Sequence, residues 1–268
     1  MKIVVCVKQV PDTASDRKLK PAASSGGGGT LDRAAVDGEV NELDTYAIEE
    51  GLRIAESQGE GSTVTVLTMG PDKAAEVIRK ALSMGADDGV HVQDDALTGS
   101  DALGTSLVLA EALRRYAEGF DLVILGSEST DARMGVMTAM VAERLGVPQV
   151  SLASKVDIDG GTIRIRRVSD DGYHEVESTL PAVISVVEKI NEPRYPSFKG
   201  IMAAKKKPVQ TVSLADLQIA PDQVGLAGAA TEVTDFSVRP PRQSGTIVKD
   251  DGDGGVKVAE FLAARKFI

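Results

Sequence analysis

The chain has 268 residues, 40 of them acidic and 30 basic, which gives a net charge of −10, and only nine aromatic residues. The charge disfavours binding to duplex nucleic acid, and so few aromatics provide no stacking platform for single strands. No run of about 18 apolar residues occurs, so no membrane-spanning helix is expected, and the single cysteine excludes an internal disulfide and a cysteine-based zinc site and indicates a reducing compartment.

Short apolar runs alternate with helical patterns over the first 150 residues. Residues 2–7 are nearly all apolar, as in a strand buried on both faces of a parallel sheet. Further strands are expected at 64–67, 89–92, 122–125 and 182–187. Apolar residues spaced by three and four predict helices within 43–57, 72–84, 101–117 and 131–145. This alternation predicts an α/β fold with a doubly wound, mostly parallel sheet.

The pattern changes after residue 150. Residues 156–159 and 162–168 flank the pair Gly160-Gly161, which predicts a hairpin. A second turn at 170–172 leads to a returning strand at 173–179. We expect this antiparallel hairpin to extend one edge of the sheet.

From residue 191 onward the regular periodicity is lost, prolines recur, and only a helix at 256–266 is expected. We therefore predict an α/β domain over residues 1–190 and a segment with a loop and a long irregular C-terminal arm over 191–268. The alternative is a disordered tail. Recurring apolar residues favour an arm laid over a partner, namely Leu214, Leu217, Val224, Leu226 and Phe236.

The sequence offers no convincing set of catalytic side chains and no metal site. Neither phosphate fingerprint, G-x-G-x-x-G or G-x-x-x-x-G-K-[ST], is present. The two histidines, His91 and His174, have no second histidine and no cysteine at helical spacing. Cys6 lies inside the first strand and is interpreted as a small buried hydrophobe.

Binding signals are stronger. Ligands of doubly wound sheets bind at the carboxyl ends of the strands, and three loops follow such ends, at 8–13, 68–71 and 126–135. The third is rich in Gly, Ser and Thr and precedes a predicted helix, where backbone N–H groups can bind an anion. Ordinary helix capping by Ser129, Thr130 or Asp131 is the alternative.

A basic segment stands out in this acidic chain. Residues 194–207 hold five basic and no acidic side chains, with Phe198, Ile201 and Met202 among them. Apolar residues among charges are typical of an anchor for a protein partner. A solvated run of charges is the alternative interpretation.

Several of these stretches together resemble the beta subunit of electron-transfer flavoproteins, over nearly the whole chain. The stretches that carry the resemblance are 8–12, 41–42, 81–87, 126–131, 180–184, 191–195 and 201–207. The run Asn191-Glu192-Pro193-Arg194-Tyr195 is the most specific of them.

The resemblance implies a Rossmann-like sheet of the adenine-nucleotide alpha-hydrolase type and an electron carrier that is not an enzyme in its own right. It implies a heterodimer with an alpha subunit that holds most of the FAD, while this chain buries one structural AMP. The heterodimer would accept electrons from acyl-CoA dehydrogenases, as in fatty acid beta-oxidation, and pass them to a membrane quinone oxidoreductase.

The resemblance also implies roles for particular residues. The AMP contacts would be Cys6, Asn41, Glu42, Leu43, Asp44, Met69, Gly126, Ser127, Ser129, Thr130, Asp131, Met134 and Gly135. Asp12 and Thr13, with Leu43, would lie near the flavin. The recognition loop for dehydrogenases would present Tyr195, Phe198, Lys199, Ile201 and Met202.

Two other functions remain possible at this stage. One is an electron-bifurcating flavoprotein subunit in which a second FAD replaces AMP. The other is a stand-alone adenine-nucleotide sensor of the universal-stress type. The composition, rich in alanine, glycine and arginine, indicates a bacterium and hence a cytoplasmic protein, although a mitochondrial matrix protein would look similar.

Overall fold

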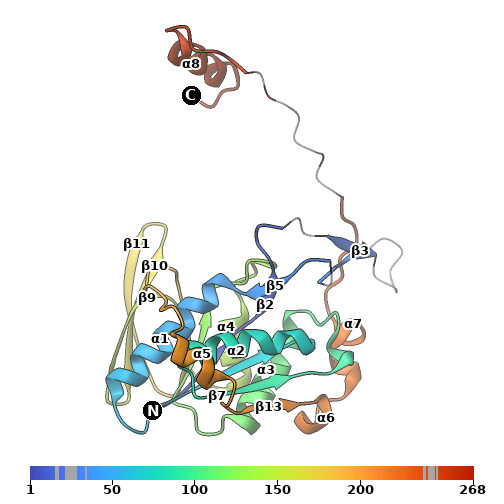
Figure 1. The fold of residues 1–268 in the computed structure, drawn as a ribbon, viewed down its shortest axis with the longest axis vertical. Coiled ribbons are helices and arrows are strands. Elements are labelled where there is room, and N and C mark those ends of the chain that lie inside the picture. The colour runs from blue at the N-terminus through green and yellow to red at the C-terminus, as the bar shows by residue number, and fades with distance from the viewer. Residues whose placement is uncertain (16–17, 22–28, 34, 238–239, 241–244, 246) are drawn as a thin grey trace. The chain divides into compact units, whose positions relative to one another are not determined.

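The computed structural model describes the chain except for residues 16–17, 22–28, 34, 238–239, 241–244 and 246 (Figure 1). The described residues form two compact units, Met1–Thr234 and Asp235–Ile268. The first unit contains the main sheet and its helices, and the second contains the helix α8, Gly254–Ala264.

A nine-stranded sheet forms the centre of the first unit, in the order β11-β10-β9-β12-β8-β1-β6-β7-β13. Its strands are β1 Lys2–Cys6, β6 Thr63–Met69, β7 Asp88–Val92, β8 Leu122–Gly126, β9 Gln149–Asp159, β10 Thr162–Ser169, β11 Gly172–Thr179, β12 Ala182–Val186 and β13 Val209–Val212. All neighbours from β9 to β13 pair in parallel, and β10 and β11 add an antiparallel hairpin at one edge. The predicted mostly parallel α/β sheet with a hairpin extension is confirmed.

Helices cover both faces of this sheet: α1 Glu42–Gln58, α2 Ala75–Met84, α3 Ala102–Tyr116 and α4 Met137–Leu145. Successive residues of a strand point to opposite faces. Accordingly Ile3 and Val5 of β1 belong to one buried cluster, with residues of α1 and α2. Val4 and Cys6 belong to a second cluster, with residues of α3 and α4. The doubly wound arrangement follows from this division.

The fourth predicted helix begins later than expected. The sequence predicted a helix within 131–145, whereas α4 begins at Met137. Residues Arg133 and Gly135 have φ of 51° and 65°, and a right-handed helix cannot contain such residues. The loop after β8 is therefore longer than the sequence pattern indicated.

Short strands that the sequence analysis did not predict follow β1. Strand β2, Gln9–Pro11, pairs antiparallel with β5, Gly38–Val40, and β3, Leu19–Pro21, pairs with β4, Gly29–Leu31. The β2–β5 pair returns the chain to the end of β1 just before α1 begins. The N-terminus of α1 is thereby placed beside the loop that follows β1 (Figure 1).

The predicted division at residue 190 is not where the structure divides. Residues 191–234 belong to the first compact unit, with β13, three short helices and a 3₁₀ turn. These helices are α5 Phe198–Ala204, α6 Leu214–Leu217 and α7 Gly225–Gly228, and the turn is Pro221–Gln223. Each element is too short to show periodicity in the sequence, which is why this region looked irregular.

Three of the expected partner-facing anchors are buried in this chain. Leu214, Leu217 and Val224 are at most 2% exposed and pack in the cluster that contains α3. Leu226, by contrast, is 45% exposed. The expectation that an arm wraps a second subunit now concerns residues 235–268, and it stays a prediction there. The predicted C-terminal helix is present as α8.

Candidate functional site

The site lies where the connections of the sheet diverge. The chain leaves β1 toward β6 on one side, whereas β8, on the other side of β1, leads on to β9 and β12. In doubly wound sheets the crevice at such a point, at the carboxyl ends of the strands, binds ligands. Here the loops after β1 and β8 and the N-terminus of α1 meet. A Cβ added to Gly126 would lie 2.5 Å from Asp44 Oδ1 and 2.8 Å from the backbone of Leu43, so only glycine fits there.

Asn41 connects these three segments and is 1% exposed. Its side-chain amide donates to the carbonyl of Glu128 at 2.9 Å and accepts from the N–H of Thr130 at 3.0 Å. Its own N–H donates to the carbonyl of Lys8 at 2.9 Å. Asn41 precedes α1, yet its side chain makes no capping bond to that helix. The side chain of Asn41 instead fixes the loop after β8.

Asp44, in the first turn of α1, is a buried carboxyl. Its Oδ2 accepts from the N–H of Lys8 at 2.8 Å. Burial raises its pKa to about 7, against the hydrogen bonds from Asn41, Lys8 and Gly126, which favour the charged form. Burial, together with the charge of Asp44, also raises the pKa of the Cys6 thiol to about 12. Cys6 is therefore a protonated thiol, 6% exposed, as predicted for a small buried hydrophobe.

Two cations hold Asp131 in the loop after β8. Lys8 Nζ lies 2.7 Å from Asp131 Oδ1 and 3.2 Å from Ser129 Oγ, and Arg33 Nη2 lies 2.9 Å from Asp131 Oδ2. Burial alone would raise the pKa of Asp131, but the charge and hydrogen bond of Lys8 and the bond from Ser129 lower it to about 2. Burial lowers the pKa of Lys8 itself. Asp131 is thus ionised, and it fixes both cations beside the crevice.

The interpretation of Ser129, Thr130 and Asp131 as helix caps is wrong. The residue before α4 is Val136, which makes no side-chain capping bond, and the hydrogen bonds of Ser129 and Asp131 run to Lys8 and Arg33. The anion-binding interpretation also changes, because these residues do not directly precede the helix. Any anion bound here would be held by loop N–H groups and the two cations, rather than by a helix dipole.

The structure brings most of the predicted nucleotide residues to one edge of the sheet. Cys6 ends β1, Met69 ends β6 and Gly126 ends β8, and these are neighbouring parallel strands. Leu43, Met69, Ser127 and Thr130 are half-buried, whereas Glu42, Met134 and Gly135 are exposed. Thr130 Oγ1 is buried with no hydrogen-bond partner among the described residues. A buried hydroxyl of this kind fits a site that is completed by a polar ligand.

The two residues expected near a flavin lie in the exposed turn after β2. Asp12 accepts from the N–H of Ala14 at 2.9 Å and from Ser15 Oγ at 2.8 Å, and these bonds lower its pKa. Thr13 donates to Glu39 Oε1 through its N–H and its hydroxyl. Both side chains thus support the local turn, and their placement near a flavin stays a prediction.

The predicted docking residues lie on α5 and on the loop before it. Helix α5 packs against α2 (Figure 1). Tyr195 is 95% and Phe198 80% exposed. Ile201 and Met202 are about half exposed, and Lys199 is exposed as well. We call residues 195–202 the docking segment. Exposed large apolar side chains gathered this closely are a mark of an interaction surface.

Sequence reasoning missed the roles of Lys8 and Arg33. Lys8 directly follows the first buried strand, and that position was the one signal available for it. Arg33 gave no signal, because its partner Asp131 is 98 residues away in the sequence. In the described part of the chain no group of three His, Cys, Asp or Glu side chains could hold a metal ion, and no described helix is long and apolar enough to cross a membrane.

The raised pKa of Asp44 predicts a pH-dependent stability. Between about pH 4 and pH 7 the folded state keeps this proton while the unfolded chain releases it, so Asp44 costs stability as the pH rises through that window. We expect Asp44→Asn to raise the thermal midpoint, relative to the unaltered protein, by more at pH 8 than at pH 4.5. Asp12→Asn is the control and should show no such trend, because the pKa of Asp12 lies below the window. A constant difference for Asp44→Asn would contradict the expectation.

The chain is similar to known proteins of one family along most of its length. The family model described as "Electron transfer flavoprotein domain" matches residues 28–217. The chain is 51% identical to "Electron transfer flavoprotein subunit beta" of Mycobacterium tuberculosis, over 99% of both chains. It is 49% identical to the protein of that name from Mycobacterium leprae over 99% of both chains, and 34% identical to that from Megasphaera elsdenii over the full length of both.

Proposed function

This chain belongs to the electron transfer flavoprotein family, with the beta subunits, and we propose that it is the nucleotide-binding and docking subunit of an electron-carrying heterodimer. Its partner would be an alpha subunit that holds most of the FAD. In this proposal the chain is a carrier component and not an enzyme by itself, and it works in the bacterial cytoplasm.

The geometry of the loop after β8 is the observation that carries the proposal. Asn41 uses both ends of its amide on that loop, and yet Thr130 Oγ1 stays buried and unpartnered among the described residues. Lys8 and Arg33 bring positive charge to the same place. A loop fixed in advance, with one unpaired hydroxyl and two cations, suits an adenine mononucleotide with its phosphate.

The residues present therefore fit AMP. Cys6 and Asn41–Asp44 would line one side of the nucleotide, Met69 its edge, and the loop residues Gly126–Asp131 the other side. Met134 and Gly135 are exposed and would contribute only the rim. AMP would be structural, since it holds together three segments that are far apart in the sequence. The FAD of the alpha subunit supplies the electron acceptance, and Asp12, Thr13 and Leu43 would face it across the interface.

Electrons would reach this flavin from acyl-CoA dehydrogenases that bind the docking segment, and would leave it for a membrane quinone oxidoreductase. A carrier needs contacts that form quickly and do not last, which favours a small apolar anchor surrounded by charge. Phe198 would be that anchor, and Lys199 would assist the encounter by charge.

Two alternatives make different predictions. An electron-bifurcating subunit would hold a second FAD where we place AMP. A stand-alone nucleotide sensor of the universal-stress type would be stable without a partner and would bind and release ATP, whereas a carrier subunit requires its alpha subunit.

The experiment is expression of the chain alone and together with its alpha subunit. We expect co-expression to yield a soluble yellow heterodimer whose flavin is bleached by a substrate-reduced acyl-CoA dehydrogenase. A compact monomer that exchanges ATP and gains nothing from the alpha subunit would contradict the proposal.

A further inference from the structure

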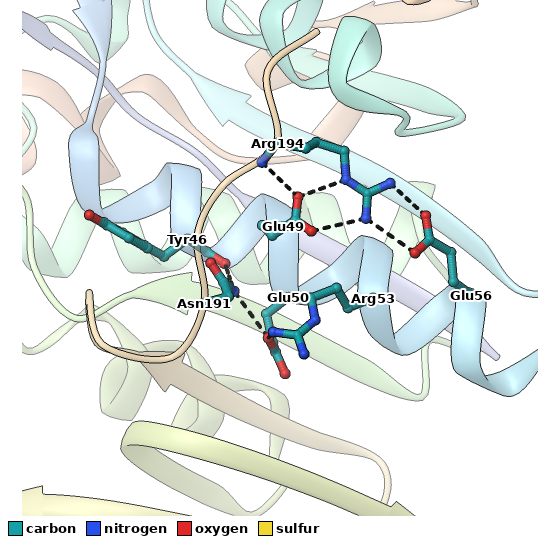
Figure 2. Close-up of polar contacts among 7 residues, drawn as sticks. All are labelled: Tyr46, Glu49, Glu50, Arg53, Glu56, Asn191 and Arg194. Atoms are coloured by element: carbon teal, nitrogen blue, oxygen red, sulfur yellow. Dashed lines mark hydrogen bonds and ion pairs between the residues drawn. The ribbon is translucent and has the colours of Figure 1, made fainter. Parts of the chain in front are cut away.

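The chain just before the docking segment is tied to α1. Arg194 places its guanidinium on Glu49 with two parallel hydrogen bonds, Nε to Oε2 at 2.7 Å and Nη2 to Oε1 at 2.9 Å (Figure 2). Its backbone N–H also donates to Glu49 Oε2, at 3.1 Å. The same guanidinium reaches Glu56, about two turns further along α1. A two-pronged contact of this kind fixes the orientation of the arginine as well as its position.

Asn191 supports the same connection three residues earlier. Its side-chain N–H₂ donates to the carbonyl of Tyr46 at 3.1 Å and to Glu50 Oε2 at 3.0 Å (Figure 2). Both partners are acceptors, so the amide orientation is determined. We call Asn191, Arg194 and their partners on α1 the α1 clamp.

The chain is held again where α5 ends. Lys207 Nζ donates to the carbonyls of Leu82, Gly85 and Ala86 at the end of α2. In return, Arg79 of α2 donates to the carbonyls of Ala204 and Lys207, at 2.7 and 3.0 Å. Carbonyls at or just after the end of each helix thus accept hydrogen bonds from a cation of the other segment.

These contacts explain why a seven-residue helix with Gly200 inside it is ordered. A helix this short is not stable by itself, and five of its seven residues face solvent, namely Phe198, Lys199, Ile201, Met202 and Ala203. Gly200 allows close approach to α2, since a Cβ there would lie 2.4 Å from the carbonyl oxygen of Ser83. Order in α5 therefore comes from the two fastened ends and from this contact.

The basic residues of the stretch 194–207 accordingly have two roles. Arg194 and Lys207 are occupied by α1 and α2, whereas Lys199, Lys205 and Lys206 are exposed. The five basic residues seen in the sequence are thus two structural cations and three that are available to a partner.

We propose that Arg194, through its paired contact with Glu49, is a positioning residue that fixes the docking segment in its binding conformation before the dehydrogenase arrives. This inference rests on the proposed docking function. A segment already ordered loses less conformational entropy on binding. The clamp therefore acts on the association of the two proteins, and not on nucleotide binding or on electron transfer within the bound complex.

The choice of variants depends on how deeply the ion pair of Arg194 and Glu49 is buried. The Glu49 side chain is 7% exposed, so removal of Arg194 alone would leave a buried, unpaired carboxylate and confuse a positioning effect with misfolding. The informative variant is the double substitution Arg194→Gln with Glu49→Gln, which removes both charges. Arg194→Lys keeps the charge without the planar fork. Arg164→Gln is the matched control, an exposed arginine on β10 that pairs with the exposed Glu177 and has no contact with the clamp.

The measurement is stopped-flow bleaching of the heterodimer flavin by a substrate-reduced acyl-CoA dehydrogenase at increasing dehydrogenase concentration. For the double variant we expect the second-order rate constant to fall about tenfold, as for loss of one well-placed anchor. The limiting rate at saturation and the FAD and AMP content should not change. Amide hydrogen exchange in residues 198–204 should become faster. Arg194→Lys should lie between, and Arg164→Gln should stay within about twofold of the unaltered protein.

Four results would overturn the inference. They are an unchanged second-order rate constant in the double variant, a loss of AMP or FAD that parallels the loss of rate, full activity in Arg194→Lys, and an equal effect of Arg164→Gln. Phe198→Ala, measured alongside, separates this inference from the proposed function. If Phe198→Ala is slow and the double variant is normal, the clamp inference fails and the docking segment stands. If both are normal, the docking function fails and the clamp inference with it.

Discussion

Phe198→Ala should slow reduction of the heterodimer by an acyl-CoA dehydrogenase about 10- to 100-fold while its FAD and AMP content stays the same. Phe198 is 80% exposed in this chain, so it has almost its full apolar surface left to bury against a partner. Full burial of such a side chain stabilises by about 1.5–3 kcal/mol, and each 1.4 kcal/mol or so is a factor of ten. The measurement is the second-order rate constant of flavin bleaching.

Tyr173→Ala is the matched control for this prediction. Tyr173 is also an exposed aromatic, 58% accessible, but it lies on β11 and stacks on Arg166. Its removal should leave the rate within about twofold, as for substitutions at the surface away from special features. Equal slowing by both variants, or loss of FAD from Phe198→Ala, would argue against a specific anchor.

Asn41→Leu should empty the nucleotide site and leave the flavin in place. The substitution keeps the side-chain volume but removes the bonds to Glu128 and Thr130. A buried backbone group without its partner costs about 1–3 kcal/mol, and two such groups are affected. We therefore expect the AMP content of the purified heterodimer to fall to about a tenth or less, with a lower thermal midpoint and with FAD retained by the alpha subunit.

Thr45→Ala serves as the control for Asn41→Leu. Thr45 lies in the first turn of α1 as well, but its hydroxyl donates only to the carbonyl of Glu42, within the same turn. It should keep its AMP. Normal AMP content in Asn41→Leu would show that the loop after β8 does not hold the nucleotide, and equal loss from Thr45→Ala would mean that any disturbance of this turn empties the site.

The main sheet could be predicted from the sequence because its strands are buried on both faces and its helices are long. A run such as residues 2–7 has few other interpretations in a chain of this length. Strand β13 and helices α5 to α7 were missed, since four to seven residues cannot display a period of 3.6. These short elements are stabilised by contacts with distant segments, such as the pairing of β13 with β7, which a local pattern does not contain.

The sequence was enough to predict where the site lies, but not which side chains contact one another in it. Loops at the carboxyl ends of strands pointed to the crevice between β1 and β8, and the structure places Asn41 and the loop after β8 there. The contacts of Lys8 and Arg33 with Asp131 join residues about 100 or more apart. Positive φ at Arg133 has no signature in the sequence, so the start of α4 was placed too early.

The docking segment, too, could be predicted only in part from the sequence. Its exposed apolar residues and its positive charge were visible in the sequence. That Arg194 is held by Glu49, 145 residues away, could not be predicted, and that contact changes how the charge is interpreted. The run of basic residues is in part a means of holding α5 in place.

The most direct test of this account is a count of the nucleotides released from the purified heterodimer with its alpha subunit. Denaturation followed by chromatography should release one FAD and one AMP per heterodimer, with AMP lost from Asn41→Leu. Two FAD and no AMP would contradict the account, because the crevice between β1 and β8 would then hold a second flavin and the chain would be a subunit of the bifurcating kind.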